Sequence, residues 1–562
     1  MSAAGTLSTP SRSGARPRGA APAAEQGAEG GARPADLQRA FGAVRSVAGL
    51  TMASRVLGLS REVLMASLLG AGAVADAFLL AWTLPNLARR LFGEGAFAAA
   101  LLPVFTESRE RGDHAGAERL VSVATTRLTM GLVLFTLLLE LGLALLRSEA
   151  AQGLYLAWGV DAARLDLPLH LSQVLLPHLV LACVAGVLGG ALNAVGRFAL
   201  PAATPSLLNL AWMGLLLVGA AAGGGDLFLV ELLAWGLLGA GVLTTWLHWR
   251  ATNGAGIALT PSLAGAPPEQ LARVRAMFRG LVLGLALFQV NCLCDQLLAW
   301  CFAPPGGVSA LNYANRLVQL PIGVLGVAIS TVIFPQLARL AKRGDLRGAG
   351  ELVDRGLAVA AFVSFPAALG LAALGQPVVE VLLARGAFDA EAAARTARAM
   401  LFLTPAVVAA CLTPVLTRAF YAEEETRLPV RISAVCVGLN LGLNLLLVGR
   451  LGEAGLALAT SVSQLVGLGL LLVCLRRRRV RRGDLPPTRT NLGRAARTAL
   501  GAVAATALAL LAWRLLPAPE PVRLGVAVGA SSLLYLGLAR LGRWPELGML
   551  LARSAQRPPG SV

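Results

Sequence analysis

The chain has 562 residues, of which 56% are hydrophobic and only 14% are charged, and its mean hydropathy is +0.68. A soluble chain of this length would carry about a quarter charged residues and would divide into several domains joined by polar linkers. The composition therefore excludes an ordinary soluble protein. The net charge of +18 would suit a nucleic-acid-binding protein, but most arginines stand in short breaks between apolar runs, so no nucleic-acid partner is expected.

Apolar runs follow one another along most of the chain. Runs of about 20 residues can cross a hydrocarbon core as helices, and a helix satisfies its own backbone hydrogen bonds, as lipid requires. The sequence predicts an all-α integral membrane protein with about fourteen transmembrane helices. The expected spans are residues 46–70, 75–104, 120–146, 168–195, 201–222, 228–250, 276–303, 310–338, 352–374, 396–420, 428–449, 454–475, 492–516 and 522–542.

The distribution of Lys and Arg predicts the topology. Loops at 70–75, 223–227 and 303–310 contain no Lys or Arg, whereas the loops between them are basic, most of all the stretch that begins at Arg476. Cytoplasmic loops carry the excess of Lys and Arg, so both termini are expected in the cytoplasm. Residues 1–42 are rich in Ala, Gly, Pro, Ser and Arg, and this composition predicts a disordered cytoplasmic tail.

Two segments of the chain resemble each other. Pro103 and Pro335 are each followed, at the same distance, by Arg-Gly-Asp, at residues 111–113 and 343–345. The repeat predicts two six-helix lobes, residues 43–250 and 251–475, followed by a basic loop and two further helices over 476–562. Because the offset spans an even number of crossings, the repeats are parallel. Transporters built from repeats bind their substrate between the two lobes.

The first two expected spans contain many charged residues for a membrane segment. These are Arg55, Arg61, Glu62, Asp76, Arg89, Arg90 and Glu94. A charge at the centre of a membrane helix costs roughly 2.5–3.5 kcal/mol, so the cluster predicts a water-filled cavity or mutual ion pairing. A cavity lined by arginines would favour an anionic substrate, because guanidinium groups bind phosphate through two parallel hydrogen bonds.

The same region resembles a known family. The stretches 54–62, 84–92 and 94–97 resemble the signature of the MurJ (MviN) family, which are bacterial lipid II flippases in the superfamily of the MATE exporters. Weaker matches follow at Pro205 with Asn209, at 313–316 and at 321–326, and the resemblance covers residues 43–550. Two positions depart from the family pattern: Glu62 stands where the family usually has Asp, and Asn315 where many members have Asp.

The resemblance implies a flippase that moves lipid II, an undecaprenyl-pyrophosphate-linked disaccharide-pentapeptide, to the outer leaflet of the bacterial inner (plasma) membrane by alternating access, for cell-wall biosynthesis. It implies a transporter that is not an enzyme, with membrane lipids and septal cell-wall synthesis proteins as further partners. Together with the charge cluster it gives the expected substrate-binding set: Ser54, Arg55, Arg61, Glu62, Asp76, Arg89 and Arg316.

A second polar group is expected among later spans. Asp295 is a lone acid in the seventh span, Asn440 and Asn444 are one helical turn apart in the eleventh, and Thr460 lies in the twelfth. If these side chains converge, their oxygens could bind a hard cation such as sodium. The alternative is that the amides and the hydroxyl form hydrogen bonds between helices, with Asp295 protonated or paired with an arginine. No other cofactor is expected.

The residues leave other functions open. A flippase for another undecaprenyl-pyrophosphate-linked polysaccharide unit would fit the same fold, and a non-transporting cell-wall scaffold would not need the arginines. A drug or cation antiporter would need acids in the cavity instead. A membrane enzyme would need catalytic carboxylates in a large extracytoplasmic loop, and no phosphate-binding loop, nucleophile elbow or zinc motif is present.

Overall fold

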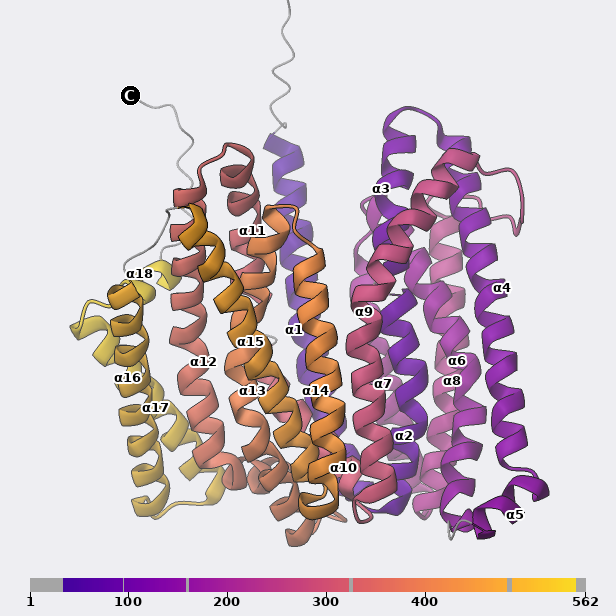
Figure 1. Cartoon of the computed structure of the whole chain (residues 1–562). Coiled ribbons are helices and arrows are strands. Elements are labelled where there is room, and N and C mark those ends of the chain that lie inside the picture. Colours follow the sequence, from indigo (N-terminus) through magenta and orange to yellow (C-terminus); the bar gives the residue numbers. More distant parts are fainter. Residues whose placement is uncertain (1–33, 94–95, 158–160, 323–326, 483–487, 552–562) are drawn as a thin grey trace, which may run out of the picture. The chain divides into compact units, whose positions relative to one another are not determined.

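The computed structural model describes residues 34–93, 96–157, 161–322, 327–482 and 488–551. The regular structure of these residues is entirely helical, which confirms the predicted all-α fold (Figure 1). The chain divides into two compact units, residues 1–46 and 47–562, and the description below concerns the second. Of the predicted tail, residues 1–33 lie outside the described residues and 34–42 belong to the first helix.

The helices of the first half of the chain are α1 (Pro34–Leu69), α2 (Ala73–Ala88), the π-helix η1 (Arg89–Gly93), α3 (Ala96–Glu110), α4 (His114–Leu146), α5 (Glu149–Ala157), α6 (Ala162–Ala194), α7 (Ala199–Ala221) and α8 (Asp226–Asn253). Those of the second half are α9 (Pro268–Phe302), α10 (Gly307–Pro321), α11 (Val327–Lys342), α12 (Leu346–Leu383), α13 (Ala390–Ala422), α14 (Arg427–Leu451), α15 (Glu453–Arg482), α16 (Thr488–Leu515), α17 (Glu520–Leu541) and α18 (Pro545–Leu551). Every expected span lies on one or more of these helices.

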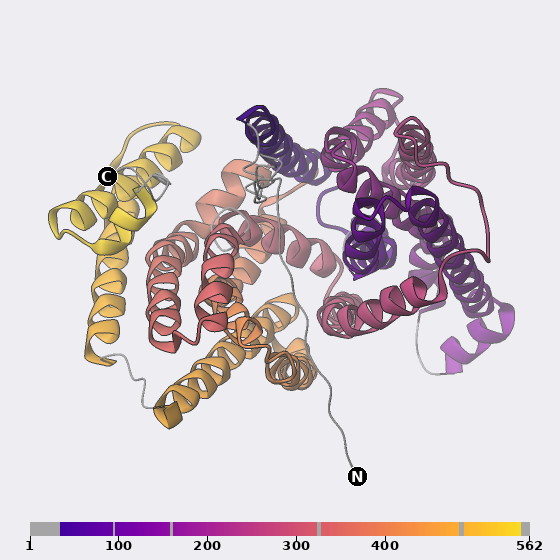
Figure 2. The same cartoon turned by 90° about the horizontal axis from the view of Figure 1, so that it is seen from above.

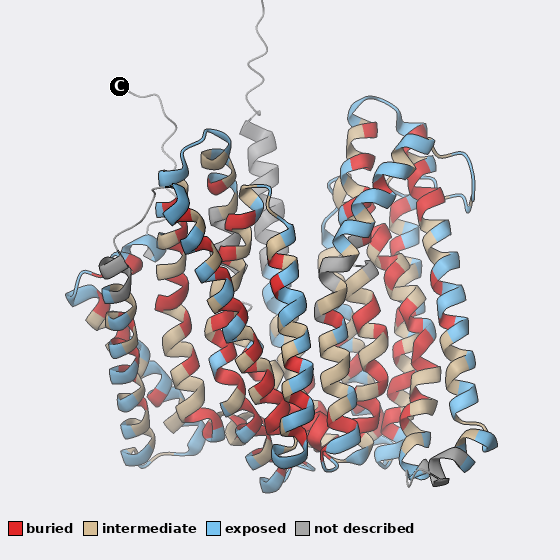
Figure 3. Ribbon diagram, in the orientation of Figure 1, coloured by how far each residue is buried: buried red, intermediate tan, exposed pale blue. Residues whose placement is uncertain are grey.

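Ten helices in the described part of the chain are long and apolar enough to cross a membrane: α4, α6, α7, α8 and α12 to α17. Helix α4 shows the lipid-facing character most clearly, because only 11% of its most apolar stretch is buried. Figure 3 shows α4 largely in the colours of exposed and intermediate residues, and leucines such as Leu134, Leu138 and Leu141 are exposed on it. The count of about fourteen spans stays a prediction. The other four expected spans are those that carry charged residues or consist of two shorter helices.

The second expected span is interrupted. It was expected as one helix over residues 75–104, but α2 passes at Arg89 into a π-helix, and α3 begins only at Ala96. Pro85 lies inside α2 one turn earlier, and a proline removes a backbone donor and clashes with the preceding turn. A π-turn adds a residue to the turn and is frequent at functional sites. It also changes which side chains after Arg89 share a face with those of α2.

The repeated Arg-Gly-Asp sequence has the same structure at both places. Gly112 and Gly344 have positive φ angles of +82° and +73°, a conformation that glycine adopts at little cost. Asp113 and Asp345 each cap the next helix, because the carboxylate accepts a hydrogen bond of 2.8 Å from the backbone N–H three residues later. The motif is therefore a turn between two helices, which explains why the repeat includes it.

Packing brings distant segments together. The largest cluster of buried apolar side chains contains residues from α1, α2, α6, α7 and α8 as well as from α10, α13 and α15. Helices α16 and α17 pack beside α12 (Figure 2), where the Tyr535 hydroxyl donates to the Phe362 carbonyl at 2.7 Å. The core thus joins the two halves of the chain along α2 and α10, which also carry the polar residues described next.

The Arg-Gly-Asp turn gives a test of the fold. We expect Gly344→Ala to lower the melting temperature of the purified protein by about 1–3 °C, because a non-glycine residue at positive φ costs roughly 1–2 kcal/mol. Asp345→Ala should lower it similarly, because an N-cap is worth about 1 kcal/mol. The matched control is Gly438→Ala, where an added Cβ would meet nothing within 4 Å. Equal melting temperatures for Gly344→Ala and Gly438→Ala would contradict this account of the turn.

Candidate functional site

A cavity of about 600 Å³ lies among helices of both halves of the chain, α1, α2, η1, α7, α9, α10, α13, α14 and α15. Its wall mixes apolar side chains with amides, hydroxyls and charged groups. The charged residues that line it are Arg61, Glu62, Arg90, Asp295 and Arg316. Cavities of this size are typical of small-molecule sites. The sequence led us to expect charge within the membrane only where such a cavity or ion pairing compensates it.

Glu62 holds two arginines at this cavity. The Glu62 carboxylate pairs with Arg61, its neighbour on α1, and accepts a hydrogen bond of 2.9 Å from Nε of Arg316 on α10. The side chains of Arg61 and Glu62 are 9% and 4% exposed, whereas that of Arg316 is 37% exposed. A buried carboxylate flanked by two guanidinium groups is compensated, and removing it would leave two like charges facing each other.

Arg61 is held from three sides. Its Nη1 donates to Oδ1 of Asn209 on α7 at 3.1 Å, and its guanidinium lies 4.4 Å from the centre of the Trp212 ring. Asn209 in turn donates to the backbone carbonyl of Ser54 at 3.2 Å. The sequence analysis singled out Asn209 only as a match to the family and did not identify Trp212. These contacts fix Arg61 in the wall, so the more exposed Arg316 is better placed to meet a ligand.

Other expected residues, on α1 and η1, lie outside the cavity lining. Ser54, Arg55 and Arg89 are not among the residues that line the cavity. Arg89 Nη2 donates to Asn86 Oδ1 at 2.9 Å at the start of η1, and the next residue, Arg90, lines the cavity instead. Arg90 continues the helical spacing of Thr83, Asn86 and Leu87 in the cavity lining, so the cavity face of α2 extends to Arg90 and not to Arg89.

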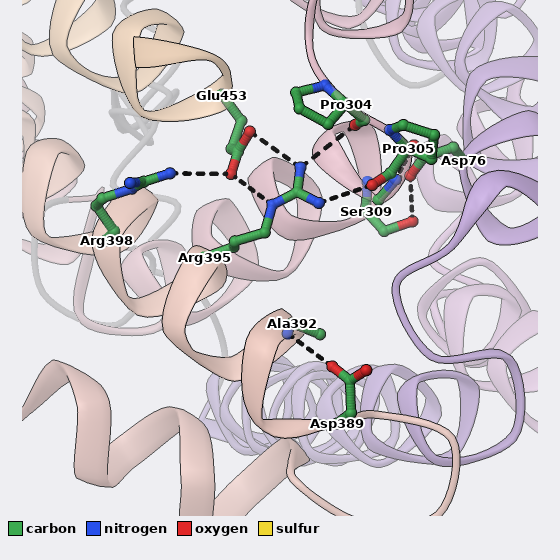
Figure 4. A network of polar contacts seen from close by, with 10 residues as sticks. Asp76, Pro304, Pro305, Ser309, Asp389, Ala392, Arg395, Arg398 and Glu453 are labelled. Carbon is green, nitrogen blue, oxygen red and sulfur yellow. Dashed lines mark hydrogen bonds and ion pairs between the residues drawn. The ribbon is translucent and has the colours of Figure 1, made fainter.

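Asp76 forms a separate polar contact (Figure 4). Its carboxylate accepts hydrogen bonds from the backbone N–H groups of Gly306 and Ser309, both at 2.7 Å, and from the Ser309 hydroxyl at 2.5 Å. These donors stand at the N-terminus of α10, where the unpaired N–H groups and the helix dipole favour a negative charge. We call these hydrogen bonds the Asp76 contact. It joins α2 to α10 and lies outside the cavity lining.

The four residues of the expected cation site do converge. Asn444 Nδ2 donates to Asp295 Oδ1 at 2.6 Å. In the amide orientation that satisfies its neighbours, Asn440 donates to Asp295 Oδ1 at 3.1 Å and accepts from the Thr460 hydroxyl at 3.3 Å. Asn440 and Asn444 are buried, and Asn444 Oδ1 has no hydrogen-bond partner. Within the described ranges no group of three or more His, Cys, Asp or Glu side chains could hold a metal ion, so this cluster offers one carboxylate and several neutral oxygens.

Comparison with known proteins identifies the family. The family model described as lipid II flippase MurJ matches residues 65–521. A probable lipid II flippase MurJ of Rhizobium tropici is 34% identical over 434 residues, which are 77% of this chain and 80% of that protein. A probable lipid II flippase MurJ of Vibrio cholerae is 32% identical over 429 residues, 76% of this chain and 81% of that protein.

Solved structures show the same fold. A structure of the lipid II flippase MurJ in an inward closed conformation superposes with a TM-score of 0.73 at 20% identity, covering 88% of this chain and 98% of that one. An inward-facing multidrug resistance MATE transporter of the MOP superfamily gives a TM-score of 0.61 at 12% identity, with coverages of 78% and 98%. The extent of the sequence matches, together with this fold, shows that the chain belongs to the lipid II flippase MurJ family.

Proposed function

We propose that this chain moves lipid II from the cytoplasmic to the outer leaflet of the bacterial inner membrane by alternating access. The observation that carries the proposal is the cavity in which Arg61, Arg90 and Arg316 stand together. A pyrophosphate is the part of such a cargo that guanidinium groups bind most strongly. The family matches are named for lipid II, which favours this cargo over another polysaccharide unit linked to the same lipid carrier.

The charge distribution supports an orientation. Both termini would lie in the cytoplasm, because the loops on that side carry most of the Lys and Arg. The segments around Asp76 and Gly306 contain no Lys or Arg over residues 70–75 and 303–310, so the Asp76 contact would lie on the extracytoplasmic side. In this arrangement the structure represents a state in which that side is closed, and the headgroup would enter from the cytoplasm.

Helix α10 connects the residue that would bind cargo to the contact that closes the extracytoplasmic side. Ser309 and Arg316 are seven residues apart, which places them two turns and about 10 Å from each other on one face of α10. Asp76 on α2 binds the first position and Glu62 on α1 binds the second. A pyrophosphate that binds Arg316 competes with Glu62 for the same guanidinium. We infer that loss of the Glu62–Arg316 pair lets α10 move, which weakens the Asp76 contact and so favours outward opening.

The expected substrate-binding residues outside the cavity, and the expected partners, can also be assigned roles in this scheme. Ser54, Arg55 and Arg89 lie outside the cavity lining but on the same helices as Arg61 and Arg90, so movement of the lobes could bring them to the headgroup. The exposed apolar faces of the helices would contact membrane lipids, and septal cell-wall synthesis proteins are the further partners that the family resemblance implies. The scheme contains no catalytic step.

The cluster around Asp295 fits a monovalent cation. Asp295, Asn440, Asn444 and Thr460 could together supply oxygen ligands, and a rotated Asn444 amide would turn its unpartnered oxygen toward the ion. One carboxylate balances a single positive charge, whereas calcium sites use several. A bound sodium ion would supply a positive charge that holds α9, α14 and α15 together.

Removing the cavity charges should impair transport. In proteoliposomes we expect Arg316→Ala to slow lipid II flipping about tenfold or more, because a charge-assisted hydrogen bond is worth about 1.5–3 kcal/mol. Arg316→Lys should retain part of the rate, since it keeps the charge but loses the planar fork. Arg355→Ala is the matched control, because Arg355 is exposed and pairs only loosely with Glu351 at 3.5 Å. Flipping by Arg316→Ala at the rate of the control would contradict the role of the cavity.

The cation site predicts a sodium effect that Asp295 controls. We expect sodium, but not choline, to raise both the melting temperature and the flipping rate of the wild-type protein. Asp295→Asn should abolish both effects, because it removes the only carboxylate of the cluster. Glu140→Gln, a change of an acid on α4 outside the cluster, should leave the sodium response intact. A sodium response that survives in Asp295→Asn would show that the cluster serves only as hydrogen bonds between helices.

A further inference from the structure

Arg395 on α13 occupies a position that the proposed transport scheme does not yet use (Figure 4). Its guanidinium donates to the backbone carbonyls of Pro305 at 2.7 Å and Pro304 at 3.3 Å. Through Nε and Nη2 it also binds both carboxylate oxygens of Glu453, at 2.9 and 3.1 Å. Glu453 opens α15, and its side chain is only 1% exposed. Arg395 thus links the start of α13, the start of α15 and the segment between α9 and α10.

The segment that Arg395 holds is the one that carries the donors of the Asp76 contact. Pro304 and Pro305 have no backbone N–H, so this turn offers only carbonyl oxygens to its neighbours. The next residue, Gly306, has a φ angle of +89°, and a Cβ there would collide with the Ala71 carbonyl. The two faces of the segment therefore have different partners. Its carbonyls meet Arg395, and the N–H groups that follow meet Asp76.

The partners also belong to different halves of the chain. Arg395 and Glu453 lie on α13 and α15, in the same half as α10, whereas Asp76 lies on α2 in the first half. The bond between Arg395 and the proline carbonyls therefore need not break when the two halves separate, while the Asp76 contact must. A bidentate arginine–carboxylate pair is a rigid support for such a turn, because its geometry is fixed in a plane.

We propose that Arg395, held by Glu453, is a positioning residue: it fixes the Pro304–Pro305 turn so that the N–H groups of Gly306 and Ser309 face Asp76, and it thereby sets how firmly the extracytoplasmic side is closed. The proposal rests on the function proposed above and deepens it, because it assigns the control of outward opening to a pair that touches neither cargo nor Asp76. An ion pair that only stabilised the fold would alter the melting temperature without changing the closed state.

The test measures closure directly, without cargo. Leu311 lines the cavity on α10 and is almost fully buried, so a cysteine at this position reports access to the cavity. The seven native cysteines are first replaced, and Leu311→Cys is labelled from outside cells with a membrane-impermeant maleimide. We expect slow labelling in the parent, labelling about tenfold faster with Arg395→Gln, as loss of a charge-assisted bond implies, and recovery toward the parent rate with Arg395→Lys.

Two further variants make the result decisive. Arg398→Gln is the matched control, because Arg398 stands one turn along α13 and only approaches Glu453, at 3.8 Å, so the labelling rate should not change. Ser309→Ala removes a donor of the Asp76 contact itself and should accelerate labelling. Acceleration by Ser309→Ala but not by a folded Arg395→Gln would overturn the proposal for Arg395.

The same experiment separates this proposal from the proposed cargo. Labelling needs no lipid II, so a chain that shows the expected rates but flips no lipid II would support the role of Arg395 and overturn the proposed transport function. If Arg395→Gln does not reach the membrane, Glu453→Gln provides the equivalent measurement. It keeps the shape of the side chain and weakens its hold on Arg395, so an unchanged labelling rate in Glu453→Gln would overturn the proposal.

Discussion

Two carboxylates of the first half of the chain hold one helix of the second. Asp76 binds the N-terminus of α10, and Glu62 binds Arg316 two turns further along it. Both carboxylates are buried, and a buried charge is tolerated only when hydrogen bonds and opposite charges compensate it. The position of α10 is therefore coupled to the pairing of these groups, and most of the proposed transport scheme depends on this constraint.

The two contacts differ in what can compete with them. The partner of Glu62 is a guanidinium at a cavity wall, so an anionic ligand can take its place. The partners of Asp76 are mainly backbone N–H groups at the N-terminus of α10. The turn before this terminus is held by Arg395. In the proposed scheme, the cargo competes for Arg316 at one end of α10, and the Asp76 contact at the other end depends on the turn that precedes the helix. This division is what an alternating-access cycle requires, because binding on one side must change closure on the other.

Much of the fold could be predicted from the sequence, because hydrophobic length is the main constraint on a membrane helix. Each expected span lies on helices, and the i, i+4 spacing of Asn440 and Asn444 places them on one helix face. Their position beside Asp295 depends on how α14 packs against α9. The interruption at Arg89 was missed, since a π-turn has no residue signature beyond a nearby proline. Arg89 was expected at the cavity from the family resemblance, whereas the helical spacing from Thr83 and Asn86 places Arg90 there.

Other parts of the site had no signal in the sequence. Two of the three donors to Asp76 are backbone N–H groups, which every residue except proline has, so the residue types alone could not predict this contact. Arg395 and Glu453 are 58 positions apart and look like ordinary charges at helix ends. Asn209 stands out only by its match to the family, and its bonds to Arg61 and to the Ser54 carbonyl depend on how α7 packs against α1.

The most direct test of the central claim is complementation of a bacterial strain depleted of its own lipid II flippase. The account predicts that the wild-type chain, once present in the membrane, restores growth and the appearance of lipid II in the outer leaflet. A chain with both Glu62→Gln and Arg316→Ala should reach the membrane but leave lipid II on the cytoplasmic side. Failure of the well-expressed wild-type chain to restore growth would contradict lipid II as the cargo, and full rescue by the double variant would contradict the role of the cavity.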